Sequence, residues 1–183
     1  MHNQTLFEQG FDIHPLFHEQ DGDTDITGDY MSMRDYSRCY ILLRKGGSED
    51  VDTGSVQILQ ATSAAGGSAK GVTVRRCWYK VGTMTGQGVW NAVSVGSGTP
   101  DDILSFGSAA GTGGTLVTVA DVNTDAFLLL IEVLAEDLDI ANGFKFITAF
   151  IEGDEVNNAC KYTADAILAN GAYQQAIPLS PLA

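Results

Sequence analysis

Acidic residues with the spacing of metal ligands occur near the start of the chain. Asp21, Asp23 and Asp25 match the first three ligand positions of an EF-hand calcium loop. That loop needs glycine at its sixth position and a bidentate glutamate at its twelfth, where this sequence has Ile26 and Ser32. We therefore expect a solvated acidic turn here and no calcium site.

The histidines offer a second possible metal site. His14 and His18 stand four residues apart and would share one face of a helix, a geometry that can hold a metal. Pro15 lies between them and disfavours a long helix, and no third ligand is close in the sequence. We expect no metal site in this segment.

Motifs of hydrolases and nucleotide-binding proteins are incomplete. Glu132 with Asp137 or Asp139 could be a glycosidase pair, but carboxylates beside a turn are more often solvated. In the glycine-rich stretch 64–71, Lys70 precedes the last glycine, so the P-loop pattern is not satisfied. The sequence has no GxSxG and no HExxH motif. We expect neither catalysis nor a cofactor.

The cysteines are few and widely spaced. Cys39, Cys77 and Cys160 form no CxxC pair, so neither a zinc site nor a dithiol redox centre is predicted. Cys39 and Cys77 lie in apolar runs and are expected to be buried free thiols, as in a protein that folds in a reducing cytosol. The first residues lack a basic stretch followed by an apolar one, so we expect no secretion signal.

Composition and charge narrow the class of protein. With 183 residues, 44% hydrophobic and 18% charged, the chain fits one folded domain with a projecting arm. The net charge of −13 disfavours binding to nucleic acid or to an anionic membrane, because both need clustered Lys and Arg. An acidic, soluble outer surface is the simplest interpretation.

The most apolar run, residues 127–134, is the expected centre of the core. At eight residues it has the length of a strand, and residues 144–151 alternate Phe144, Phe146, Thr148 and Phe150 on one face. Asn142-Gly143 between them tolerates the positive φ angles of a tight reversal, so we predict an antiparallel hairpin. Residues 39–44 and 56–61 predict a second hairpin with a longer connection.

Further short strands complete the expected fold. Residues 72–81, 89–95, 103–106 and 116–119 read as strands, and 160–168 is predicted as a strand despite its alanines. About eight short strands with turn residues between them and no long helix are typical of an all-β, antiparallel, jelly-roll-like β-sandwich. We assign residues 1–20 to an extended N-terminal arm and 21–183 to the sandwich.

Three regions are predicted to contact a partner protein. The arm has scattered aromatics that need another surface to cover them, among them Phe7, Phe11 and Phe17. Arg75 and Arg76 beside Trp78 could stack on nucleic acid, but the net charge favours their meeting acidic groups of a protein partner. The proline-interrupted C-terminal tail offers Leu179 and Leu182 for packing in extended form.

Several loose motifs resemble one known family. Residues 29–36 (DYMSMRDY) before an apolar strand, 131–133 (IEV), 137–139 (DLD) and 142–144 (NGF) resemble small capsid-associated proteins of tailed bacteriophages, of the cement or decoration type. The likeness covers about residues 28–168 and leaves the arm uncovered.

The resemblance implies a virion structural protein without catalytic residues. Its expected partners are the major capsid protein and further copies of itself in a homotrimer on the outside of the capsid shell. It would be synthesised in the host cytoplasm and reside on the capsid surface of the virion. Two alternatives stay open: another virion part, such as a tail, adaptor or head-fibre protein, or a carbohydrate-binding module using Trp78, Trp90 and tyrosines.

Overall fold

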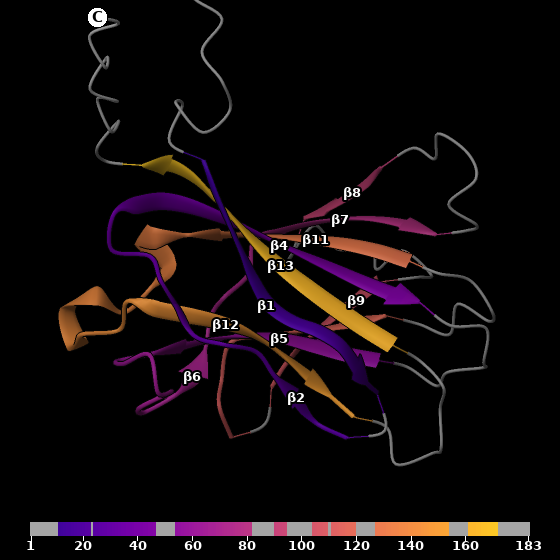
Figure 1. The fold of residues 1–183 in the computed structure, drawn as a ribbon, viewed down its shortest axis with the longest axis horizontal. Coiled ribbons are helices and arrows are strands. Elements are labelled where there is room, and N and C mark those ends of the chain that lie inside the picture. Colours follow the sequence, from indigo (N-terminus) through magenta and orange to yellow (C-terminus); the bar gives the residue numbers. More distant parts are fainter. Residues whose placement is uncertain are drawn as a thin grey trace, which may run out of the picture.

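The fold consists of two antiparallel β-sheets packed face to face (Figure 1). The computed structural model describes residues 11–22, 24–46, 54–81, 90–94, 104–109, 111–119, 127–153 and 161–171. Apart from two short 3-10 helices, the regular elements in these ranges are strands, so the predicted all-β antiparallel sandwich is confirmed.

Among the described residues, six strands form the first sheet and seven the second. The first has the order β1 (Asp12–Asp21), β13 (Lys161–Gly171), β4 (Tyr36–Gly46), β11 (Phe127–Leu134), β7 (Arg76–Val81) and β8 (Asn91–Ser94). The second has the order β2 (Ile26–Thr27), β12 (Phe146–Glu152), β5 (Gly54–Ala61), β10 (Thr115–Val119) and β9 (Leu104–Ser108). In this sheet β3 (Met31–Ser32) also pairs with β12, and β6 (Lys70–Gly71) pairs with β5. The predicted strand at 160–168 is thus confirmed as β13.

The order of the strands is that of a jelly roll. The chain passes between the sheets from β1 to β2 and β3, then to β4, β5 and, after an insertion, β10 to β13. This gives the interlocked orders β1-β13-β4-β11 and β2-β12-β5-β10, as two Greek keys folded over each other do. The insertion adds β7 and β8 beside β11 and adds β9 beside β10.

The two predicted hairpins are wrong. β11 lies in the first sheet and β12 in the second, and the same holds for β4 and β5. Residues 135–145 cross between the sheets through 3-10 helices η2 (Ala135–Asp137) and η3 (Ile140–Asn142). Gly143 does adopt a positive φ of 86°, but this ends η3 and does not close a two-residue turn.

Ion pairing and hydrogen bonds fix the crossing segment. Asp139 accepts a bond from Lys70 Nζ at 2.5 Å and from Asn142 Nδ2 at 2.9 Å, and its N–H donates to Gln60 Oε1 at 2.8 Å. Lys70 Nζ also lies 4.2 Å from the centre of the Phe144 ring. The hydrogen bond from Lys70, followed by that from Asn142, lowers the pKa of Asp139 below its ordinary value.

This lowered pKa predicts a pH-dependent contribution to stability. A carboxyl whose pKa is depressed by folding stabilises the fold at neutral pH and loses that effect as the pH falls through its folded pKa. Asp139→Asn should therefore lower the melting temperature at about pH 7, and the difference from the unmodified protein should shrink below 3.8, the ordinary aspartate pKa. Thermal unfolding followed across this pH range measures it, and a pH-independent difference would contradict it.

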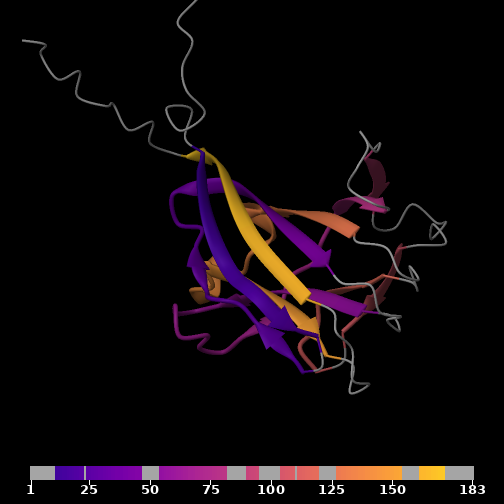
Figure 2. The same ribbon diagram turned by 45° about the vertical axis from the view of Figure 1, so that its right-hand side comes forward.

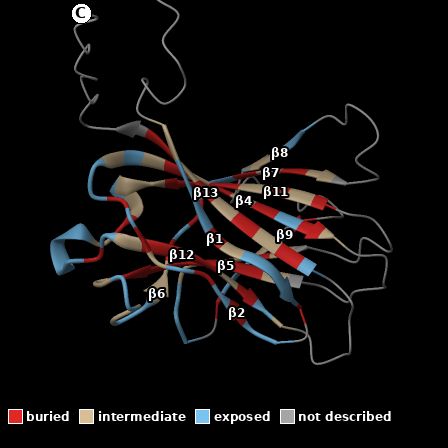
Figure 3. Ribbon diagram, viewed as in Figure 1, coloured by how far each residue is buried: buried red, intermediate tan, exposed pale blue. Residues whose placement is uncertain are grey.

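The core lies between the sheets. Alternate residues of each strand point inward, which places Ile41 and Leu43 of β4 and Leu129 of β11 opposite Ile58 of β5 and Ile147 of β12, all fully buried. In Figure 3 the buried segments accordingly run through the middle strands of both sheets.

The two described cysteines belong to this core. Cys39 and Cys77 are fully buried free thiols, as predicted, and Cys160 lies outside the described residues. Burial raises the pKa of Cys39 far above its usual range and that of Cys77 to about 12. Cys39 pairs with Val133 and Cys77 with Ile131, so β11 separates the two thiols.

These thiols are expected to be unreactive in the folded protein. Because the thiolate is the nucleophile and both thiols are buried, a Cys160→Ser variant should show almost no reaction with a thiol reagent under native conditions. Both thiols should react at once in concentrated guanidinium. Rapid labelling of the folded variant, measured by absorbance and mass spectrometry, would show that the sandwich opens far enough to expose the core in which both thiols lie.

Part of the predicted arm is a strand of the sandwich. Residues 12–21 form β1, which pairs with β13 at the edge of the first sheet and twists beside it (Figure 2). Leu16 is buried, and the register shifts on both sides of Phe17. An edge position suits Pro15, which has no N–H to donate to a ladder. The structure therefore differs from the predicted arm boundary at residue 20, and residues 1–10 lie outside the described ranges.

Candidate functional site

The outer face of the first sheet carries an unusual set of side chains. Side chains alternate along a strand, so the residues next to buried ones point away from the core. The register between the strands aligns these outward residues in rows. Leu130 lies between Leu42 and Trp78, and Glu132 lies between Tyr40 and Arg76. We call this surface the cation–aromatic face; its residues on the three central strands are Arg38, Tyr40, Leu42, Arg44, Leu128, Leu130, Glu132, Arg76, Trp78 and Lys80.

Aromatic rings and cations are stacked across this face. The rings of Tyr40 and Trp78 lie 6.2 Å apart between centres with their planes tilted by 59°. The guanidinium of Arg76 lies 5.7 Å from the centre of the Trp78 ring, and that of Arg38 lies 6.0 Å from that of Tyr40. Lys80 Nζ lies 5.0 Å from the centre of the Trp90 ring. These distances are within the range of cation–π attraction.

Glu132 is the buried carboxylate at the base of the face. It is 8% exposed, and its Oε1 lies 3.3 Å from Nε of Arg38. That Nε is buried and makes no hydrogen bond, so the two groups attract as charges and not through a directed bond. Arg38 instead donates through Nη1 to the Tyr40 hydroxyl at 3.1 Å, which is the largest cause raising the pKa of the Arg38 guanidinium above its ordinary value.

The charge of the face is opposite to that of the chain. Arg38, Arg44, Arg76 and Lys80 are four of the ten Lys and Arg residues in a protein of net charge −13. On the described part of this face, Glu132 offsets Arg38, and Asp165 of β13 pairs with Arg44. The face is therefore locally positive on an acidic molecule, and its charge is complementary to that of an acidic surface.

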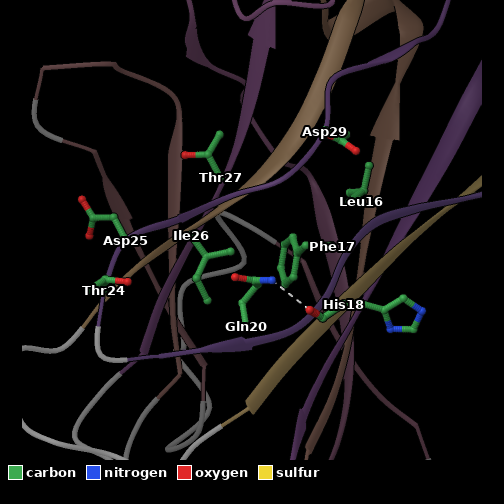
Figure 4. A pocket seen from close by; sticks show the side chains of 9 residues that line it. All are labelled: Leu16, Phe17, His18, Gln20, Thr24, Asp25, Ile26, Thr27 and Asp29. Atoms are coloured by element: carbon green, nitrogen blue, oxygen red, sulfur yellow. Dashed lines mark hydrogen bonds between the residues drawn. The ribbon is translucent and has the colours of Figure 1, made fainter.

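A groove runs along the edge of the sandwich between β1 and residues 24–29. Its volume is about 440 Å³, and Leu16, Phe17, Ile26, Asp25 and Asp29 are among the residues lining it (Figure 4). The Phe17 side chain lies within the groove, whereas the His18 ring points away from it (Figure 4). No group of three or more His, Cys, Asp or Glu residues is placed to hold a metal within the described ranges.

The predicted contact residues are spread over different parts of the molecule. Arg76 belongs to the cation–aromatic face, and the half-buried Phe17 lines the edge groove. Phe11 is half-buried just before β1. The remaining residues predicted in the arm and the C-terminal tail lie outside the described ranges: Phe7, Leu179 and Leu182.

Arg75 and Arg76 have different surroundings although they are adjacent. Arg75 precedes β7 and forms ion pairs with Glu136, at 3.0 Å, and with Asp137 of the same chain. Arg76 begins β7 and stacks over Trp78. Acidic partners for Arg75 thus already exist within the molecule, and contact of either arginine with another protein stays a prediction.

Several residues of the face were not predicted as a site. Tyr40, Lys80 and Arg38 belong to strands that are separated in sequence and that β11 brings together. The sequence pattern that could have predicted this face is the alternation of a strand, because cationic and aromatic residues occupy every second position from 76 to 80 and from 38 to 40.

No helix among the described elements has the length and apolar content needed to cross a membrane. Comparisons of the chain with protein-family models, curated proteins and solved structures found no match.

Proposed function

We propose that this protein is a structural component of a tailed-phage virion, a cement or decoration protein that binds the outside of the major capsid shell and stabilises it. In this proposal it acts as a homotrimer, performs no catalysis and needs no cofactor. It is synthesised in the host cytoplasm and resides on the capsid surface.

The cation–aromatic face is the observation that carries the proposal. Tyr, Trp and Arg are the residues most enriched at the energetic centres of protein interfaces, and here they occupy the middle of an open sheet surface. Such a surface suits docking onto a large, slightly curved partner better than it suits enclosing a small molecule. The resemblance in residues 29–36, 131–133, 137–139 and 142–144 gives the class of partner.

The jelly roll supports the proposal only in a general way. This architecture occurs in viral capsid proteins, but also in lectins and cupins, so the fold alone does not fix a function. A stable interface needs roughly 1,200–2,000 Å² of buried surface. A cement protein could reach this by contacting several capsid subunits at once, and linked contacts of this kind add avidity.

Binding to particles tests the proposal directly. The purified protein is mixed with particles of the phage that encodes it, from which the protein has been stripped, and bound protein is measured by sedimentation and cryo-electron microscopy. Density on the outer shell, with a trimeric mass by light scattering, is expected. Absence of density on the shell would overturn the proposal, and a copy number near a dozen would indicate an adaptor or tail protein.

A second candidate function has one observation in its favour. Trp90 is 38% exposed, and Trp78 and Tyr40 lie nearby on the same sheet, an arrangement that could also receive a sugar ring. A glycan array with the unmodified protein and a Trp78→Ala variant separates the two functions. Saturable glycan binding that is lost in the variant would favour a carbohydrate-binding module.

A further inference from the structure

Two cations on β7 have no acidic partner among the described residues. Arg38, Arg44, Lys70, Arg75 and Lys161 each lie in an ion pair, but neither Arg76 nor Lys80 does so with any described residue. Arg76 is opposite Glu132 in the register, yet that carboxylate lies against Arg38 on the other side. The charges of Arg76 and Lys80 are therefore available to a partner.

Both cations are held in place by aromatic rings. Arg76 stacks over Trp78 and Lys80 over Trp90, at 5.7 Å and 5.0 Å from the ring centres. Ordering of long side chains before binding reduces the conformational entropy that association would otherwise cost. Arg76, Trp78 and Lys80 occupy alternate positions of one strand, so the Cα atoms of the two cationic residues are about 13 Å apart with an aromatic residue between them.

We infer that Arg76, Trp78 and Lys80 form a docking stripe for an acidic protein surface, one that presents two carboxylates about 13 Å apart on either side of an apolar side chain. The carboxylates pair with Arg76 and Lys80, and the apolar side chain packs on Trp78 and on Leu130 beside it. The inference rests on the proposed function and deepens it, because it gives the chemistry of the capsid surface that this face meets.

A protein fits this stripe better than a nucleic acid. The chain carries −13 overall, so a polyphosphate approaching it is repelled at long range, whereas an apolar side chain flanked by two carboxylates brings little charge. Binding of single strands uses several aromatic rings on which successive bases stack, whereas here Arg76 stacks over the Trp78 ring and Tyr40 is tilted against it.

A model peptide tests the chemistry of the stripe. The probe is a labelled peptide of repeated Glu-Ser-Leu-Ser, which in extended form spaces its carboxylates about 13 Å apart with leucine between them. Binding to the full chain is measured by fluorescence anisotropy and by the change in tryptophan emission, at low and high salt. Peptides of repeated Lys-Ser-Leu-Ser and an oligothymidine serve as comparison probes.

The test variant is Arg76→Glu with Lys80→Glu, and its matched control is Arg34→Glu with Lys145→Glu. The control pair is exposed, lies together beside β3 and β12, and changes the net charge equally. The acidic peptide should bind in a salt-sensitive manner, and the test variant should lose at least about tenfold in affinity while the control keeps it. Equal losses in both variants, no binding of the acidic peptide, or tighter binding of oligothymidine would overturn the inference.

The same variants distinguish this inference from the proposed function. If the unmodified protein binds capsid particles and the test variant binds them equally well, the docking stripe is wrong and the proposed function stands. If the acidic peptide binds as expected but particles do not, the proposed function fails and the stripe stands with another acidic partner. Circular dichroism of both variants verifies that a loss of binding is not a loss of folding.

Discussion

Replacing Leu129 with alanine should lower the free energy of unfolding by about 2–5 kcal/mol, whereas the same change at the adjacent Leu130 should cost roughly 1 kcal/mol. Leu129 is fully buried and points between the sheets, where its neighbours in the register are Leu43 and Tyr79. Removing its side chain leaves a cavity that the two packed sheets can fill only in part. Leu130 is half-buried on the cation–aromatic face.

Urea unfolding followed by tryptophan fluorescence and circular dichroism measures both variants. The slope of the free energy of unfolding against urea concentration should be the same for the two variants, so that a difference in their unfolding midpoints reports a difference in stability. Leu130→Ala should weaken binding of the acidic peptide, and Leu129→Ala, at temperatures where it is folded, should not. Equal destabilisation by the two changes would mean that β11 does not separate a buried face from an open one.

The β class and the individual strands could be predicted because alternation is a local property. Cys39, Ile41 and Leu43 alternate with polar or half-exposed residues, and the structure buries all three. The pairing of strands could not be predicted in the same way. A strand with an apolar inner face must pack against a second sheet. Its sequence does not determine whether the next strand along the chain pairs with it in the same sheet or lies in the opposite sheet.

The Asn142-Gly143 pair shows how this ambiguity misled the prediction. Gly143 does have a positive φ, but this ends η3 within the crossing between the sheets and does not close a hairpin. The sequence of strand β1 was ambiguous in a similar way. Its polar and apolar residues alternate irregularly because its register shifts around Phe17, and such a segment is typical of an arm as well as of an edge strand.

The candidate site was only partly predictable. Arg75 and Arg76 were considered together because they are adjacent, but Arg75 lies before β7 and meets η2, while Arg76 lies on the outer face of the sheet. Lys80 and Tyr40 belong to this face only because β11 brings β4 and β7 to its two sides. A surface formed by three strands from distant parts of the sequence has no local motif.

Among the glycines that the structure describes, Gly71 is the one at which an added methyl group would make the shortest contact. A Cβ there would lie 1.8 Å from the carbonyl oxygen of Gly113 and 2.4 Å from Nε2 of Gln57, and the first of these is backbone. Gln57 donates to that same carbonyl at 2.6 Å, so the contact also breaks a hydrogen bond of a buried side chain. Gly71→Ala should cost about 3 kcal/mol or more, from overpacking and the loss of this bond.

Gly107→Ala is the matched control, because nothing lies within 4 Å of a Cβ at Gly107 in β9. That change should be neutral or stabilise by a few tenths of a kcal/mol to about 1 kcal/mol, as for an unstrained Gly→Ala replacement. Urea unfolding compares the two variants. If Gly71→Ala matched Gly107→Ala, β6 could not pack against the turn before β10 as closely as described.

The Gly71→Ala substitution should also affect the cation–aromatic face. Residues 72–75 carry the chain from β6 in the second sheet to β7 in the first, and the N–H of Val72 bonds to Ile58 O while that of Val74 bonds to Thr115 Oγ1. These bonds set where β7 begins and therefore where Arg76, Trp78 and Lys80 lie. A Gly71→Ala protein that still folds should consequently bind the acidic peptide more weakly, although residue 71 is not part of the docking stripe. Unchanged peptide binding in such a folded variant would mean that β11 alone positions β7.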